Sequence, residues 1–480
     1  MNRQAITGVF REQGCHAYQA KLAADFLDEG SPRHHLLVTP AGLGKVLIAS
    51  QIAGFMVKQR QARRILVVAP SPFCMLWRSR LEGQSLPVPV QLMYGRDFRE
   101  APADPTKART PWPESVIAVV PCDTATKPDI QDTLAASHWD LVILAEVQGH
   151  SRCQSVGLYQ QMHSAQAIER SLLISDSPIE LSTVSAQASL PEFHVTNWFD
   201  ELADWDGQTI ELPPVKWKVL EYTRSEPEVR FHRLVQEQLE RSDSVHSPFR
   251  FQTELLLRRA VSSPYAAQQT LDIMGRKLNR TALGRLETNV EKEHGDPTEV
   301  EDVPQLSFNP EARQSYLSFV KEGFRAFQEI VTDAKLECLL GLLGELADSR
   351  PGRICVLCAC ADTVSYIHDA LAEVGIPSVT INGGLRYTQR QEAMKEFVHG
   401  GGILLATPGA LGEESDLNRV KHVIHYDLPA NRSQVCTIEG RFGRINRSDS
   451  CRMYALEDIS GVKSDPSAIP RLIGEPLEAV

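Results

Sequence analysis

A glycine-containing turn near the N-terminus has residue types that could hold a phosphate group. The segment TPAGLGKV covers residues 39–46 and includes Gly42, Leu43, Gly44 and Lys45. Such a turn between a strand and a helix can point backbone N–H groups at a phosphate, while a lysine reaches the outer oxygens. The sequence therefore predicts a nucleotide-phosphate site. The alternative is a glycine turn that only packs a helix against a sheet.

Two residues of this segment differ from the usual phosphate-binding pattern. Thr39 stands where the first glycine belongs, and Val46 stands where a serine or threonine hydroxyl would bind magnesium. An aliphatic side chain offers a metal ion no oxygen. The turn therefore keeps residues suited to phosphate but lacks one expected metal ligand.

Short apolar strands are needed to position this turn. From about residue 35 to 185, strands rich in Val, Ile and Leu alternate with helical stretches, and the fourth strand ends in the acidic Glu146. Near-continuous apolar runs of this length are typical of strands buried on both faces of a parallel sheet. The five predicted strands cover residues 35–39, 65–70, 116–121, 140–146 and 171–176.

The same alternation returns in the C-terminal part of the chain. Residues 226–285 carry long helical patterns, and the acidic residues 288–305 are interpreted as an exposed linker. We therefore predict an α/β fold with two doubly wound parallel-sheet lobes and a helical insertion between them. The later predicted strands cover residues 353–359, 378–382, 402–407, 422–429 and 452–458.

Composition limits the classes of protein to consider. The chain has 480 residues, a net charge of −11 and ten cysteines, and no apolar run long enough to cross a bilayer. The charge argues against a wholly basic nucleic-acid binder, although local groups of Lys and Arg can still contact phosphates. With no apolar signal segment, a cytoplasmic protein without a membrane partner is predicted. Cys355, Cys358 and Cys360 are interpreted as buried core residues rather than as a zinc site.

Two of these segments resemble motifs of superfamily 2 helicases of the Swi/Snf type, in which GLGKT and WDLVIxDEAH are typical. Residues 42–45 match the nucleotide-binding motif, and residues 139–143 match the strand of the magnesium-binding motif. The resemblance implies that Glu146 orients and activates the attacking water. It also places Ala145 where the family has its magnesium-binding aspartate, and Gln148 where it has a histidine.

Further segments match the same family in order along the chain. Tyr18 and Gln19 resemble a pair that lies near the adenine, and residues 65–77 resemble a segment that contacts the nucleic-acid backbone. Three more segments resemble LTGTPIQN, LRKxCxHP and SGKLxxLxxLL, at residues 173–181, 257–266 and 333–343. The resemblance therefore extends over almost the whole chain.

The last motifs lie in the predicted second lobe. Residues 381–390 resemble the DGS…R stretch, and residues 422–432 are close to HVIxYDLPWNP. An ungapped match places Arg441 and Arg444 on the two arginines that meet the γ-phosphate in this family. A gapped match would use Arg444 and Arg447 instead, and the sequence leaves both assignments open.

The resemblance also implies an organisation, a cofactor and partners. It implies RecA-like lobes at residues 1–205 and 331–480, with a helical region at residues 206–330. Double-stranded DNA is the expected partner, and a partner protein subunit is a further hypothesis. ATP is the expected cofactor, with weak binding, and its predicted contacts are Gln19, Gly42, Leu43, Gly44 and Lys45.

Loss of both magnesium ligands decides the predicted function. If Val46 and Ala145 each remove about 2–3 kcal/mol of transition-state stabilisation, hydrolysis slows by about 10³–10⁴. We therefore predict a pseudo-motor that binds DNA and ATP but hydrolyses ATP poorly. One alternative is an active ATP-dependent DNA translocase with a rearranged set of magnesium ligands. Asp140 and Asp176 are the candidate carboxylates for it, although Asp140 starts its strand, far from the carboxyl end. The other alternative is a protein-interaction scaffold that binds no nucleotide.

Overall fold

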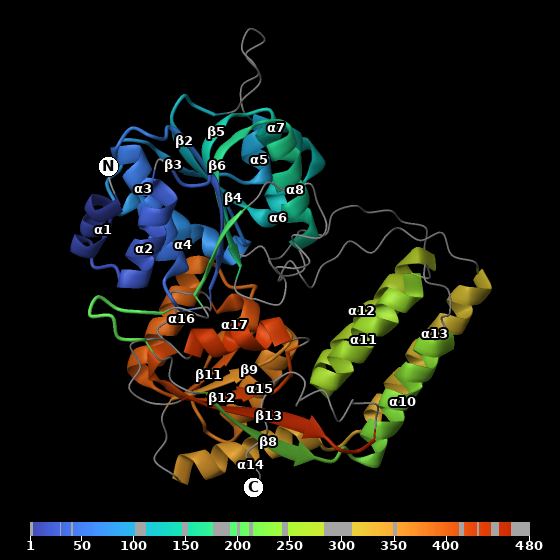
Figure 1. Cartoon of the computed structure of the whole chain (residues 1–480). Helices are drawn as coiled ribbons and strands as arrows, with labels where there is room; N and C mark the ends of the chain where they lie inside the picture. The colour runs from blue at the N-terminus through green and yellow to red at the C-terminus, as the bar shows by residue number, and fades with distance from the viewer. Residues whose placement is uncertain are drawn as a thin grey trace. The chain divides into compact units, whose positions relative to one another are not determined.

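The computed structural model forms two units, each built on its own parallel sheet (Figure 1). The first unit comprises Met1–Pro213 with two later segments, Gly412–Glu414 and Ser433–Ser448, and the second comprises the rest of the chain. The residues that the structure describes are 3–28, 30–39, 42–100, 112–145, 152–175, 193–198, 202–210, 215–241, 248–282, 310–348, 353–411, 417–429, 432–442 and 451–461.

The first unit contains a seven-stranded sheet in the order β3-β4-β2-β5-β6-β1-β7, with every neighbouring pair parallel. Because all strands run in the same direction, the segments that follow them leave from one edge of the sheet. The strands are β1 (His34–Val38), β2 (Arg64–Ala69), β3 (Val90–Leu92), β4 (Val116–Pro121), β5 (Trp139–Leu144), β6 (Ile168–Ser175) and β7 (His194–Asn197).

Helices cover both faces of this sheet (Figure 1). Side chains alternate along each strand, so that Leu37 and Val67 pack in one core while Leu36 and Val68 pack in the other. The first core is closed by α1 (Arg3–Glu12), α2 (Ala17–Leu27), α3 (Lys45–Lys58) and α4 (Ser71–Glu82). The second face carries α5 (Gly95–Glu100), α6 (Cys122–Ala125), α7 (Pro128–Ala135) and α8 (Arg152–Ser164).

The second unit contains a six-stranded parallel sheet in the order β10-β11-β9-β12-β13-β8. Its strands are β8 (Lys216–Tyr222), β9 (Arg353–Leu357), β10 (Ser378–Ile381), β11 (Ile403–Ala406), β12 (Val420–His425) and β13 (Arg452–Asp458). The helices that follow its strands or lead into them are α14 (Ala334–Asp348), α15 (Ala361–Glu373) and α16 (Tyr387–Gly400). Helix α17 (Arg432–Phe442) groups by its contacts with the first unit.

Four long helices of the second unit have an apolar core of their own. This core contains Phe231, Leu256, Leu271 and Tyr316, one residue from each helix in turn, and all four side chains are buried. The helices are α10 (Glu226–Arg241), α11 (Pro248–Ser262), α12 (Pro264–Ala282) and α13 (Pro310–Gln328). They form the helical part that the sequence pattern predicted, set apart in Figure 1 from the strands of their unit.

The predicted fold class is confirmed, because two parallel-sheet α/β lobes and a helical insertion are present. Each of the ten predicted strands has a counterpart in the structure. Three strands were not predicted, namely β3, β7 and β8, and β8 lies inside the range that was predicted as helical. The division at residues 205 and 330 stays a prediction, and the predicted linker at 288–305 lies outside the described residues.

Two further observations concern composition. Within the described ranges, no helix has both the length and the apolar character that a membrane crossing requires. Cys355, Cys358 and Cys360 are buried free cysteines, and burial raises the pKa of each thiol. They lie in and directly after β9, as core side chains of the second unit.

Candidate phosphate-binding site

The predicted phosphate turn connects the end of β1 to the first residue of α3. Gly42 and Gly44 have φ angles of 88° and 79°, in the left-handed region that favours glycine. At Gly44 a β-carbon would also collide with the side-chain nitrogen of Gln19. Both glycines are therefore required by the backbone of this turn.

Two side chains of α2 hold this turn through one carbonyl group. The Gln19 Nε2 donates to the Leu43 oxygen at 2.9 Å, and the Tyr18 hydroxyl donates to the same oxygen at 3.1 Å. Gln19 Oε1 accepts the backbone N–H of His16 at 3.0 Å. Both side chains are buried, and burial raises the pKa of Tyr18. Gln19 and Tyr18 therefore position the turn, and the predicted contact of this pair with an adenine stays a prediction.

Lys45 starts helix α3 and lines a small pocket at the carboxyl edge of the first sheet. The Lys45 residue is 3% exposed. Its ammonium group is the cationic part of a lining that is otherwise apolar or aromatic. The pocket is lined by Lys45, Val46, Pro70, Phe73, Trp77, Ala145 and Ile174.

Val46 and Ala145 lie in this same pocket, which tests whether magnesium fits there. Magnesium takes oxygen ligands in near-octahedral geometry and keeps several of its waters. Neither Val46 nor Ala145 has a side-chain oxygen, and the remaining lining residues supply no carboxylate. Among the residues that the structure describes, no group of three or more His, Cys, Asp or Glu side chains could hold a metal ion. The described pocket therefore does not fit magnesium.

Asp140 is one of the two carboxylates proposed as replacement ligands. Its Oδ2 accepts the backbone N–H groups of Arg63 and Arg64, at 2.6 and 2.8 Å. Asp140 lies at the start of β5, whereas Ala145 follows the other end of that strand. Asp140 therefore joins the beginnings of two strands and lies away from the pocket. Asp176 and the predicted catalytic residue Glu146 lie outside the described residues.

Trp77 is a lining residue of this pocket, whereas the sequence placed it at the end of a segment expected to contact the nucleic-acid backbone. Its side chain is fully buried in α4, and its indole Nε1 has no hydrogen-bond partner among the described residues. A buried donor without an acceptor is costly, and water or a ligand oxygen usually supplies the acceptor. The pattern of residues 65–77 did not indicate a place beside Lys45, because only the packing of α4 makes Trp77 a lining residue of the pocket.

Arg441 is the described member of the predicted arginine pair. Its guanidinium carbon lies 5.8 Å from the ring centroid of Phe73, a lining residue of the pocket, and the side chain is buried. Helix α17 and Phe73 group in the same unit. Arg444 and the alternative Arg447 lie outside the described residues, so the choice between the two pairs stays open.

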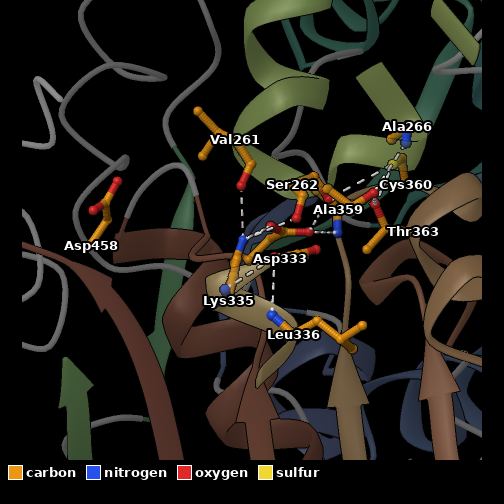
Figure 2. A network of polar contacts seen from close by, with 12 residues as sticks. Val261, Ser262, Ala266, Asp333, Lys335, Leu336, Ala359, Cys360, Thr363 and Asp458 are labelled. Atoms are coloured by element: carbon orange, nitrogen blue, oxygen red, sulfur yellow. Dashed lines mark hydrogen bonds and ion pairs between the residues drawn. The ribbon is translucent and has the colours of Figure 1, made fainter. Parts of the chain in front are cut away.

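In the second unit, three of the segments that resemble helicase motifs meet in one polar network (Figure 2). Lys335 Nζ lies 2.6 Å from Asp427 Oδ1, and both side chains are more than nine-tenths buried. The second carboxylate oxygen of Asp427 accepts the Ser262 hydroxyl at 2.6 Å and the Ala359 N–H at 2.7 Å. The segments at 257–266, 333–343 and 422–432 are thus brought together by one buried ion pair.

The same network supplies two donors to a carbonyl group at the C-terminal end of α11. Lys335 Nζ donates to the Val261 oxygen at 3.0 Å, and Arg224 donates to it at 3.3 Å. Arg224 also forms a buried ion pair with Asp458 at 2.6 Å. Cations at a helix C-terminus interact favourably with the helix dipole and with carbonyls that lack a partner within the helix. Arg224 and Asp458 were not predicted as a pair from the sequence, because no motif surrounds either residue.

Comparison with known proteins gives a family match in the C-terminal half of the chain. A model of the helicase conserved C-terminal domain matches residues 334–446. Curated relatives include ATP-dependent RNA helicase glh-1 of Caenorhabditis elegans, 32% identical over 102 residues, and DEAD-box ATP-dependent RNA helicase 35A of Oryza sativa subsp. japonica, 31% identical over 119 residues. The matches cover 21% and 25% of this chain, and 13% and 17% of those relatives.

A solved structure supports the fold over nearly the whole chain. The structure of S. cerevisiae Dbp5 bound to RNA and ADP BeF3 has a TM-score of 0.52, with 13% sequence identity. The match covers 97% of this chain and 90% of that chain. At this identity the likeness concerns the fold alone, and it agrees with two RecA-like lobes.

These findings overturn the predicted DNA partner, and they support the helicase superfamily without supporting the Swi/Snf type within it. The expected partner, double-stranded DNA, is contradicted, because the relatives are named RNA helicases and the Dbp5 structure contains RNA. The resemblance that suggested DNA rested on short motifs, whose contacts are mainly with phosphates that DNA and RNA share. Neither of the two relatives carries a name of the Swi/Snf type.

Proposed function

We infer that this superfamily 2 helicase-like chain binds ATP and RNA, and that it hydrolyses ATP poorly. The observation that carries this proposal is that Val46 and Ala145 line the same pocket as Lys45. The pocket therefore keeps the lysine suited to a phosphate while lacking the oxygens suited to magnesium. Within the superfamily, the Swi/Snf type is a finer proposal that rests on the resemblance of short sequence motifs, first of all residues 42–45 and 139–143.

The nucleotide part of this proposal rests on the geometry of the turn. Gly42 and Gly44 give the turn its left-handed backbone, and Lys45 begins the helix that follows. Helix N-termini favour negative charge, so this end of α3 suits a phosphate group. The relatives named as ATP-dependent helicases support ATP as the nucleotide.

The impaired hydrolysis follows from how phosphoryl transfer is catalysed. Hydrolysis depends on positioning the phosphates and on neutralising the charge that develops on them, which magnesium normally does. Two lost ligands at about 2–3 kcal/mol each would lower the rate by about 10³–10⁴. A motor that turns over at about 10 s⁻¹ would then fall to about 10⁻² s⁻¹ or less.

Steady-state phosphate release, measured with and without single-stranded RNA, tests the proposal. Native protein is compared with a Val46→Thr/Ala145→Asp double variant, which returns both oxygen ligands. We expect slow native release and at least a tenfold gain in RNA-stimulated release in the double variant. Lys45→Ala added to the double variant should remove that gain. Fast native release that Lys45→Ala abolishes would show that magnesium is held elsewhere and would overturn the proposal.

A further inference from the structure

The pocket beside Lys45 has lost its metal ligands without becoming a site for another metal. Val46, Ala145, Phe73 and Ile174 give it an apolar lining, and Trp77 adds an aromatic one. Magnesium gives up its water reluctantly. In a magnesium–nucleotide complex that entered this pocket, the hydrated ion would contact apolar side chains. It would gain no oxygen ligand from Val46 or Ala145 to replace its waters.

Two donors in this lining could instead reach a phosphate oxygen directly. Lys45 supplies an ammonium group at the start of α3. Trp77 supplies an indole N–H that is fully buried and has no acceptor among the described residues. Hydrogen bonds to a charged acceptor are about twice as strong as neutral ones, so an anionic oxygen suits both donors.

From this we propose that the pocket binds the phosphate chain of a nucleotide without a divalent cation, with Lys45 and the Trp77 N–H as direct donors. The inference rests on the proposed nucleotide binding and adds to it the form of the ligand, a metal-free nucleoside diphosphate or triphosphate. It makes Trp77 a binding residue in addition to its packing role in α4. It also implies that magnesium competes with the protein for the nucleotide.

Affinity for fluorescent methylanthraniloyl-ADP, measured on the full chain in excess EDTA and in excess MgCl₂, tests the metal dependence. The native protein should bind the probe in EDTA at least as tightly as in magnesium. In the Val46→Thr/Ala145→Asp variant this order should reverse. The new carboxylate repels an uncoordinated phosphate but helps to hold a magnesium ion.

Trp77→Phe tests the indole donor, because it removes the N–H and keeps most of the aromatic ring. We expect about a tenfold loss of probe affinity, the size expected for one hydrogen bond to a charged group. Trp112→Phe is the matched control, since Trp112 is also buried with an Nε1 that lacks a partner among the described residues, in the core on the other face of the sheet. Its affinity should stay within about twofold of native.

A spectroscopic readout separates binding from packing. The indole ¹⁵N–¹H resonance that is missing in Trp77→Phe identifies Trp77, and it should shift when ADP is added in EDTA. Equal losses of affinity in the two tryptophan variants, or an unmoved Trp77 resonance, would overturn the role of Trp77. Probe binding that requires magnesium in the native protein would overturn metal-free binding. Absence of probe binding in both buffers would instead count against the proposed nucleotide binding itself.

Discussion

The residues of the Lys45 pocket differ in how much of their role the sequence indicated. Gly44, Lys45 and Val46 are adjacent, so the sequence alone indicated a phosphate turn with one metal ligand missing. That Ala145 shares a pocket with Val46 could only be expected through a family resemblance. The sequence placed Trp77 only in a segment expected to contact the nucleic-acid backbone, because its place in the pocket lining depends on which side of α4 faces the pocket.

His425 gives a prediction at the residue scale. Its ring is fully buried and stacks on Trp217, with 5.0 Å between the two ring centroids. Neither ring nitrogen has a hydrogen-bond partner among the described residues. Burial lowers the pKa of His425 to about 3, from an ordinary value near 6.5. The unfolded chain therefore binds this proton at a higher pH than the folded chain does. Above pH 6.5 the ring is neutral in both states and burying it carries no protonation cost. As the pH falls from about 6.5 towards 3, protonation of the unfolded chain lowers the free energy of unfolding.

His425→Phe should remove this part of the pH dependence. Below pH 6, the free energy of unfolding should fall less steeply with decreasing pH in the variant than in the native protein. The difference between the two slopes should be about 1.4 kcal/mol per pH unit. Urea unfolding at pH 7 and pH 5 measures the difference. The control is His399→Gln, a change at an exposed histidine of the same unit, which should leave the slope close to native. An unchanged slope in His425→Phe would contradict the assignment.

At the scale of elements, the position of a strand in its sheet decided whether the sequence predicted it. The predicted strands are rich in Val, Ile and Leu, because most of them have a neighbour on each side and helices on both faces. The three unpredicted strands, β3, β7 and β8, all lie at sheet edges. β7 reads HVTN and β8 reads KWKVLEY, and such polar composition is common at edges, which are less buried.

The contacts between elements were harder to predict than the elements. Lys335 and Asp427 lie 92 positions apart, and each belongs to a segment that resembled a helicase motif for separate reasons. Their pairing depends on where α14 begins and where β12 ends, and the same pair also meets the end of α11. No periodicity in one segment contains that information, because the pairing belongs to tertiary packing.

The Lys335–Asp427 pair gives a prediction at the scale of elements. Lys335→Met leaves a buried carboxylate without its cation and should lower the free energy of unfolding by about 3–5 kcal/mol. Asp427→Asn keeps an acceptor for Ser262 and Ala359 while removing the charge. Because the two residues interact directly, the double variant should cost clearly less than the sum of the single variants.

A double-mutant cycle by urea unfolding measures this coupling. The control is the exposed pair Arg230–Glu329 of the same unit, in which a guanidinium nitrogen lies 2.8 Å from a carboxylate oxygen. The coupling energy of this exposed pair should be below about 1 kcal/mol. Coupling in the buried pair should exceed that of the exposed pair by about 2 kcal/mol. Equal coupling in the two pairs would mean that the buried network does not join these elements strongly.

For the whole molecule, charge and fold constrain the nucleic acid in different ways. The net charge of −11 means that binding to a phosphate backbone depends on local basic groups rather than on the overall field. The fold is compatible with either nucleic acid, since contacts to phosphates carry no sequence information. The choice between RNA and DNA depends on the 2′-hydroxyl and on the shape of the strand.

RNA preference is the prediction that belongs to the whole chain. Single-stranded RNA should bind at least tenfold more tightly than a DNA duplex of the same sequence, measured by fluorescence anisotropy at one fixed salt concentration. Single-stranded DNA of that sequence is the control, because it differs from the RNA mainly by lacking the 2′-hydroxyl. If the chain reads the 2′-hydroxyl, the RNA will also exceed this control. Equal affinity for the two single strands would mean that strand shape alone decides, and tighter binding of the duplex would contradict the proposed RNA partner.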